Sequence, residues 1–158
     1  MDDKELFKND QQAKSYAQFR PVCPAEVYDE IISECLGRDL AVDIACGTGQ
    51  STRPLASHFK EVVGIDVSEA QINEASADKP SNAKFQVGPA EDLSDFESNS
   101  VDLVTCSQAV HWFDRPKFYR EVDRVLKPGG TVALYGYCSK QLPNCPDASA
   151  VFADVSMW

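Results

Sequence analysis

Short apolar runs alternate along this chain with segments in which apolar residues recur every three or four positions. The short runs predict strands and the periodic segments predict helices. Apolar runs with little internal alternation are typical of strands that are covered on both faces of a sheet. The predicted strands are 40–45, 62–67, 84–87, 101–106 and 131–137, and the predicted helices are 24–36, 50–59, 68–77 and 114–126.

Capping residues sharpen two of these helix boundaries. Ser68 and Gln71 match a capping box, which predicts a helix start at Ser68. Asp114 is a good N-cap residue, with Pro116 in the first turn that follows. The Lys-Pro-Gly-Gly run at 127–130 is expected to end that helix before the last predicted strand.

Strands that alternate with helices predict a doubly wound α/β fold, with a mainly parallel sheet and helices on both faces. The length of 158 residues suits one such domain. We expect an N-terminal helical or lid segment at 1–39, an α/β core at 40–138 and a tail at 139–158. In such sheets ligands bind at the carboxyl ends of the strands, so residues just after each strand are the candidates for function.

A glycine turn follows the first predicted strand. Asp43 lies near the end of that strand, and Gly47 and Gly49 come before the next helix. Glycine lets the backbone approach a ligand closely. Asp66 ends the second predicted strand, where a carboxylate can accept hydrogen bonds from both ribose hydroxyls of an adenosine. The alternative is an aspartate that only helps the Ser68 helix to begin.

Five segments, 42–49, 63–68, 88–93, 101–106 and 126–131, together resemble the motifs of class I S-adenosylmethionine-dependent methyltransferases, in the same order. The resemblance implies the Rossmann-like methyltransferase fold and S-adenosylmethionine as the cofactor. Members of that family usually have seven strands, so the sequence predicts a sheet that lacks the last two. The 139–158 tail is then the start of a truncated C-terminal part.

Within that family the chain resembles the methyltransferase type 11 group and the branch that includes trans-aconitate methyltransferases. The run from His111 to Asp114 and the Tyr16, Arg20 and Pro21 pattern carry this second likeness. It implies a small-molecule methyl acceptor, with a carboxylate as one candidate. His111 is the candidate catalytic base, with a packed histidine at the pocket rim as the alternative. Tyr16, Arg20 and Trp112 are the candidate substrate or lid residues.

The resemblance also implies a set of cofactor contacts. They follow the strands in the expected order along the sheet. The implied contacts are Asp43 to the methionine amino group, Ala45, Gly47 and Gly49 to methionine and ribose, Asp66 to the ribose hydroxyls, Val67, Ala90 and Glu91 to adenine, and Ser107 and Gln108 beside the methyl group.

Two positions depart from the family pattern. Ala45 stands where glycine is usual, and we expect it to be tolerated if its φ is negative. Pro89 stands where an aspartate often contacts the adenine amino group, which leaves that contact to Glu91 or to water.

Two other functions stay open. An NAD-dependent oxidoreductase would need a G-x-G-x-x-G fingerprint, and Thr52 occupies the place of its third glycine. The acid after the second strand fits both cofactors. A truncated, non-catalytic form that binds cofactor weakly, or serves as a binding module, is the other alternative.

Composition narrows the partners. The net charge of −10 would repel nucleic acid and anionic membrane surfaces, so neither is expected as a partner. The six cysteines form no C-x-x-C pair and the chain has two histidines, so no metal site is expected. Free thiols, a charged N-terminus and no apolar run of about 20 residues favour a cytoplasmic protein. The oligomeric state is left open.

Overall fold

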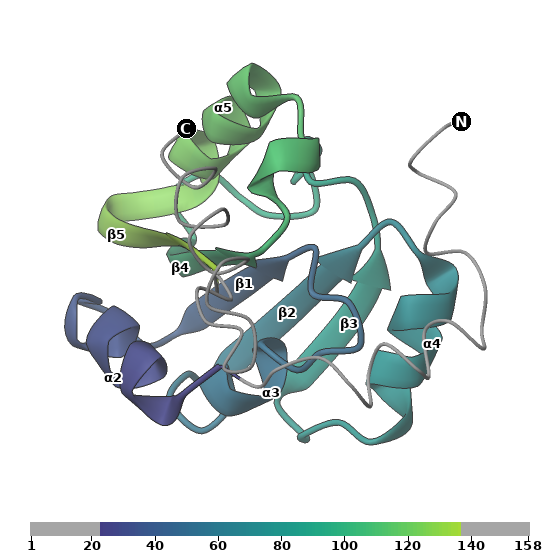
Figure 1. Ribbon diagram of the computed structural model, residues 1–158. Coiled ribbons are helices and arrows are strands. Elements are labelled where there is room, and N and C mark those ends of the chain that lie inside the picture. Colours follow the sequence, from purple (N-terminus) through teal and green to yellow (C-terminus); the bar gives the residue numbers. More distant parts are fainter. Residues whose placement is uncertain (1–22, 137–158) are drawn as a thin grey trace, which may run out of the picture.

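The computed structural model describes residues 23–136. They form a three-layer α/β domain around one five-stranded parallel sheet in the order β3-β2-β1-β4-β5 (Figure 1). The elements are α2 (Ala25–Ser33), β1 (Leu40–Ile44), α3 (Thr52–Leu55), β2 (Glu61–Asp66), α4 (Glu69–Ala77), β3 (Ala83–Val87), β4 (Val101–Ser107), the 3₁₀ helix η2 (Val110–Trp112), α5 (Arg115–Val125) and β5 (Leu126–Tyr135).

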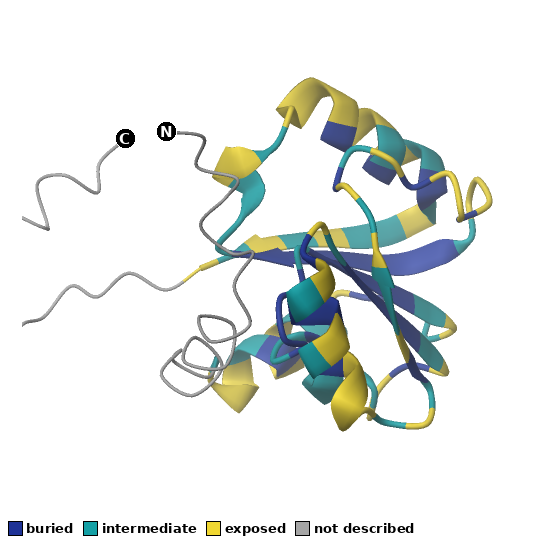
Figure 2. Ribbon diagram, turned by 90° about the vertical axis from the view of Figure 1, so that its right-hand side faces the viewer, coloured by how far each residue is buried: buried dark blue, intermediate teal, exposed yellow. Residues whose placement is uncertain are grey.

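Two hydrophobic cores cover the two faces of the sheet. On one face, Phe118, Val122 and Val125 of α5 pack against the strands together with residues of the loop after β3. On the other face, Tyr28 of α2 and Leu55 of α3 pack against β1, β2 and β4. The central strands are therefore dark in the burial colouring of Figure 2, while the outer faces of the helices are exposed. This arrangement confirms the predicted doubly wound fold.

The predicted helix caps are confirmed. The Ser68 hydroxyl accepts a hydrogen bond from the backbone N–H of Gln71 at 3.4 Å, and α4 begins at the next residue. Asp114 accepts from the N–H of Lys117 at 3.4 Å and precedes α5. Both caps satisfy N–H groups that a helix start leaves without an intrahelical partner.

The helix predicted over 50–59 is wrong in its length, because α3 spans only Thr52–Leu55. After it, the N–H groups of Ala56, Ser57 and His58 bond to carbonyls three residues earlier, which is the tighter pattern of turns. Pro54 lies in the single helical turn, where its missing N–H is tolerated. The predicted helix of ten residues is therefore longer than the four-residue helix that the structure contains.

The last strand begins earlier than the prediction of 131. Leu126 already pairs with Val101, and the register then shifts before Leu103 pairs with Thr131. The Lys-Pro-Gly-Gly run therefore forms an irregularity within β5, with Gly129 at a φ of 78°. The preceding helix ends at Val125, one residue before the predicted end at 126.

No helix among residues 23–136 is long and apolar enough to span a membrane. The predictions for Tyr16, Arg20 and the 139–158 tail lie outside the described residues.

Candidate functional site

The strand order reverses between β1 and β4. From β1 the chain moves outward through β2 to β3, and from β4 it moves outward in the other direction to β5 (Figure 1). In doubly wound sheets the turns after two such strands diverge to opposite faces, so a ligand-binding crevice is expected between them at the carboxyl edge. Most of the predicted cofactor contacts follow strands that end at this edge.

Two non-glycine residues at this crevice have a left-handed backbone. Ala45, directly after β1, has a φ of 55°, and Gln108, directly after β4, has a φ of 58°. A side chain in this region costs about 1–2 kcal/mol. The negative φ that would make Ala45 an easy replacement for glycine is thus absent. Strain of this kind is concentrated at functional sites.

Backbone hydrogen bonds hold both strained turns in place. The N–H of Cys46 donates to the carbonyl of Ile65 at 3.0 Å, which ties the β1 turn to β2. The N–H of Gln108 donates to the carbonyl of Tyr135 at 2.9 Å, which ties the β4 turn to β5. The surrounding sheet therefore fixes the conformation of both turns.

Asp66 joins the glycine turn to α4. Its Oδ2 accepts a hydrogen bond from the N–H of Gly47 at 2.9 Å, and its Oδ1 accepts one from the N–H of Ser68 at 2.9 Å. Asp66 therefore helps α4 to begin and also lies against the glycine turn. The carboxylate and the turn converge at one edge of the sheet, as the adenosine interpretation requires.

Sequence reasoning missed the ring of Phe85, which packs beneath the glycine turn. A Cβ added to Gly49 would lie 2.7 Å from Phe85 Cζ, and one added to Gly64 would lie 2.6 Å from Phe85 Cδ1. Gly49 also has a φ of 80°, so any other residue there would be strained as well. A glycine in the middle of the second strand was the available signal for this close packing.

Asp43 is a fully buried carboxylate behind the glycine turn. Its Oδ2 accepts from the hydroxyl of Thr52 and its Oδ1 from the hydroxyl of Thr105, both at 2.7 Å. Buried charges need such hydrogen bonds. Burial, and then the charges of Asp43 and Asp66, raise the pKa of the Cys46 thiol well above its ordinary value. This thiol therefore stays protonated, and the negative charge at the site belongs to the carboxylates.

The residues expected to meet adenine are divided between surface and core. Val67, just after β2, is 70% exposed and offers apolar surface at the edge of the sheet. Ala90 is buried in the core on the α5 face. The Glu91 carboxylate accepts a hydrogen bond from the N–H of Asp114 at 2.8 Å, so it anchors the loop after β3 to the start of α5.

Further contacts fix the same loop to α5. The guanidinium of Arg124 donates to the carbonyls of Leu93 at 2.8 Å and Phe96 at 2.9 Å. Glu121 accepts from the N–H of Leu93 at 3.0 Å, and the hydrogen bond from Arg124 lowers the pKa of Glu121. A surface pocket of about 430 Å³ lies over these charged side chains, and neither Asp66 nor the glycine turn lines it.

The residues expected near the acceptor follow β4. Ser107 is buried at the end of that strand, and Gln108 turns the chain toward η2. His111 is exposed and Trp112 is 53% exposed, with their ring centroids 4.8 Å apart. These two rings form a small exposed aromatic surface in the segment that follows β4.

The chain is similar to known methyltransferases. The family model described as "Methyltransferase domain" matches residues 42–134. A Dictyostelium discoideum protein whose name describes it as a methyltransferase is 42% identical over 140 residues. The match covers 88% of this chain and 52% of that relative. The probable S-adenosylmethionine-dependent methyltransferase CRG1 of Saccharomyces cerevisiae is 35% identical over 155 residues, covering 93% and 52%.

A solved structure agrees with these relatives. A protein described as a type II methyltransferase from Anaeromyxobacter dehalogenans is 36% identical, with a TM-score of 0.70 over 76% of this chain and 50% of that one. The present chain spans about half the length of these relatives. The family match and the shared fold lead to one conclusion: the chain belongs to the methyltransferase domain family.

Proposed function

We propose that this chain binds S-adenosylmethionine along the carboxyl edge of β2, β1 and β4 and serves methyl transfer to a small-molecule acceptor. The observation that carries the proposal is the 2.9 Å hydrogen bond between Gly47 N–H and Asp66 Oδ2, which brings the two ribose-binding elements together. Bound S-adenosylmethionine supplies a methyl group that the sulfonium charge has already activated. The task of the protein is then to position the two reactants, which can lower a barrier by about 7–11 kcal/mol.

The residues at this edge fit the cofactor in charge and polarity. Asp66 would hold the ribose hydroxyls, and Val67 would cover one face of the adenine ring. The buried charge of Asp43 would favour the positive methionine amino group from behind the glycine turn. Ser107 and Gln108 would border the methyl group at the end of β4.

Thr52 argues against NAD as the cofactor. It occupies the place of the third glycine of a dinucleotide fingerprint, where the side chain must be absent for helix and strand to pack closely. Here the Thr52 hydroxyl instead donates to Asp43 at 2.7 Å, a contact that glycine cannot make. This side chain supports the methyltransferase interpretation of the turn.

The acceptor class that we propose is a small carboxylate. The likeness of His111–Asp114 to the trans-aconitate branch supports it, and a carboxylate oxygen needs no base to be methylated. His111 and Trp112 follow β4 and are exposed, so an acceptor can reach them. An acceptor that carries a proton would use His111 as its base.

We also propose a cytoplasmic location. Four cysteines, Cys23, Cys35, Cys46 and Cys106, are free thiols among residues 23–136. Unpaired thiols are typical of a reducing compartment.

Calorimetric titration with S-adenosylhomocysteine tests the cofactor site. We expect saturable one-to-one binding by the unmodified chain. Asp66→Asn should weaken it at least about tenfold, because hydrogen bonds to a charged acceptor contribute about 1.5–3 kcal/mol. Asp123→Asn, an exposed site on α5, is the control and should leave the affinity unchanged. Absence of binding by the unmodified chain would overturn the proposal.

Transfer of a labelled methyl group to a panel of di- and tricarboxylic acids tests the acceptor. We expect a product that releases labelled methanol in base, because methyl esters hydrolyse there and N-methyl products do not. Binding of S-adenosylhomocysteine without transfer to any acceptor, including amines and phenols, would instead favour the non-catalytic alternative.

A further inference from the structure

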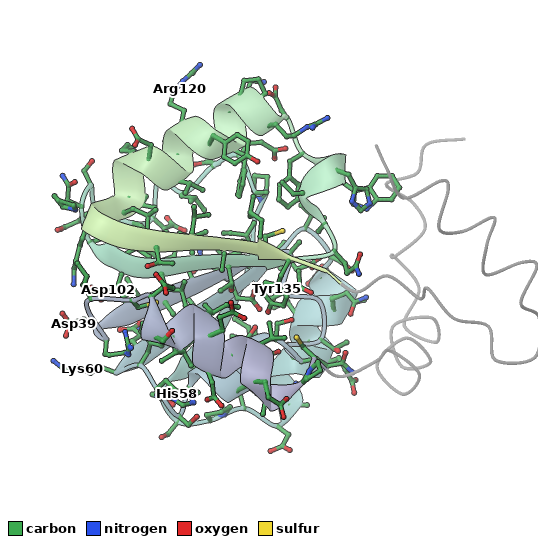
Figure 3. All side chains as sticks on the ribbon, turned by 60° about the vertical axis from the view of Figure 1, so that its left-hand side comes forward. Asp39, His58, Lys60, Asp102, Arg120 and Tyr135 are labelled. Carbon is green, nitrogen blue, oxygen red and sulfur yellow. The ribbon has the colours of Figure 1, made fainter. Side chains whose placement is uncertain are left out.

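Tyr135 carries a buried hydroxyl that the proposed function has not used. It ends β5, pairs with Ser107 of β4, and thus lies toward the carboxyl edge of the sheet. Figure 3 shows it far from Asp39, Lys60 and Asp102 at the opposite edge. The ring is partly buried and the hydroxyl oxygen is buried. Within residues 23–136 no group meets this oxygen with full hydrogen-bond geometry, although the hydroxyls of Tyr28 and Ser51 lie near enough to affect its titration.

A buried hydroxyl without a partner is uncommon in a folded protein. It loses its hydrogen bonds to water on folding and gains none in return, so it lowers stability. Replacing tyrosine by phenylalanine at such a site would relieve this penalty. A tyrosine that keeps an unpaired hydroxyl beside a ligand site points to a bond that forms only when the ligand is present.

The surroundings make this hydroxyl a donor. The Tyr28 ring contacts the Tyr135 ring edge-on at a centroid distance of 6.4 Å, and the buried Asp43 carboxylate lies close enough to affect its titration. Burial, followed by the negative charge of Asp43, raises the pKa of Tyr135 far above its ordinary value. The hydroxyl therefore keeps its proton at every physiological pH.

Its place in the sheet indicates which part of the cofactor it can meet. Asp66 ends β2, which is the neighbour of β1 on one side. Tyr135 ends β5, which lies two strands from β1 on the other side. In the proposed binding mode the ribose lies at Asp66 and adenine at Val67, so the amino acid end of the cofactor points away from β2 toward β4 and β5. The carboxylate at that end needs a donor, because the nearby Asp43 charge would otherwise repel it.

We propose that Tyr135 donates a hydrogen bond to the carboxylate of the methionine moiety when the cofactor binds. Tyr135 is then a cofactor-binding residue that distinguishes S-adenosylmethionine from adenosine derivatives that lack the amino acid. This inference rests on the proposed function, since it requires the cofactor to lie across the same edge.

The experiment compares two ligands with Tyr135→Phe. S-adenosylhomocysteine has the carboxylate, and 5′-methylthioadenosine lacks the amino acid end. We expect Tyr135→Phe to bind S-adenosylhomocysteine about tenfold more weakly, the loss of one charge-assisted hydrogen bond, and to bind methylthioadenosine as the unmodified chain does. Without ligand, the variant should melt at the same or a higher temperature. Tyr119→Phe, on the exposed face of α5, is the matched control.

Three results would overturn the inference. These are unchanged affinity of Tyr135→Phe for S-adenosylhomocysteine, an equal loss for both ligands, or a lower melting temperature without ligand, which would mark a structural role. If the unmodified chain binds neither ligand, the proposed function itself fails and the inference fails with it. If the unmodified chain binds both and only the variant departs from expectation, the proposed function stands and this inference alone is wrong.

Discussion

Ala45 and Gln108 set the backbone conformation of the two turns at the carboxyl edge of the sheet. Each is left-handed, and each directly follows one of the two central strands. The strain persists because the sheet fixes the neighbouring residues, as the bonds from Cys46 to Ile65 and from Gln108 to Tyr135 show. The left-handed conformation of these two residues costs local free energy, and the fold maintains it in the absence of a ligand.

Ala45→Gly should stabilise the protein. Relief of the left-handed strain is worth about 1–2 kcal/mol, and the added flexibility of the unfolded chain removes about 0.5–1 kcal/mol, so the net gain is about 0.5–1 kcal/mol. Urea denaturation measures it. Ala41→Gly, at a buried strand position, has no strain to relieve and should destabilise the chain. A loss of stability in both variants would contradict the strain at Ala45.

Local sequence patterns were enough to single out residues at strand ends and in the glycine turn. They did not reveal hydrogen-bond partners that are distant in the sequence. The turn at Gly47 and the acid at Asp66 follow from strand ends and glycine spacing. The hydroxyl of Thr105 reaches Asp43 from 62 positions away, and no local pattern signals that contact. The role of Glu91 in holding Asp114 was hidden for the same reason.

Strands β1, β4 and β5 are joined at their amino ends by a charge network. The buried Asp102 carboxylate accepts from the N–H groups of Asp39 and Leu40 at 2.8 and 2.9 Å, and from Lys127 Nζ at 2.8 Å. Lys60 also pairs with Asp39 at 2.7 Å, and both residues lie at this edge in Figure 3. Lys127 pairs with Asp39 at 3.0 Å. Burial raises the pKa of Asp102, but the hydrogen bonds outweigh this effect and leave it below its ordinary value.

Asp102→Ala should lower the free energy of unfolding by about 2–4 kcal/mol, because two partly buried backbone N–H groups and an ammonium lose their acceptor. Gly37→Ala should act through the same carboxylate, since its Cβ would lie 2.0 Å from Asp102 Oδ1. Both variants should still bind S-adenosylhomocysteine under conditions where they are folded. Urea denaturation measures the loss of stability, and calorimetry measures the binding of S-adenosylhomocysteine. Loss of binding by the folded variants would contradict the claim that the charge network at the amino edge is separate from the cofactor site at the carboxyl edge.

Elements with strong local signals were predicted well, and those shaped by their neighbours were not. The Ser68 cap and the apolar stripe of α5 depend on residues close in sequence, so their patterns are complete in the chain. The extent of α3 depends on how the 56–60 turns fit under β1 and β2. The early start of β5 at Leu126 depends on pairing with Val101, which only the folded sheet provides.

The whole molecule should lose stability in acid over a defined range. Lysines 60 and 127 hold the pKa of Asp39 at about 2, below its ordinary value of 3.8. A carboxyl with a lowered pKa in the folded state stabilises the fold above its unfolded pKa and loses that contribution as the pH falls through its folded pKa. The contribution of Asp39 is therefore complete above about pH 4 and is lost between about pH 4 and pH 2.

Urea titrations at several pH values check this dependence. We expect the midpoint to fall below about pH 4, and we expect a smaller fall for Asp39→Asn, which has no proton to gain there. Asp123→Asn, outside the network, should follow the unmodified chain. An Asp39→Asn curve identical to that of the unmodified chain would show that the network does not govern acid stability.

The central claim is that one cofactor site lies at the carboxyl edge of the sheet, and nuclear magnetic resonance tests it most directly. On titration with S-adenosylhomocysteine, we predict shifts of the backbone amide signals of Gly47, Val67 and Gln108, with those of Leu40 and Asp102 unchanged. Shifts confined to the amino edge or to the charged pocket on α5, or no shifts at saturating ligand, would contradict the account.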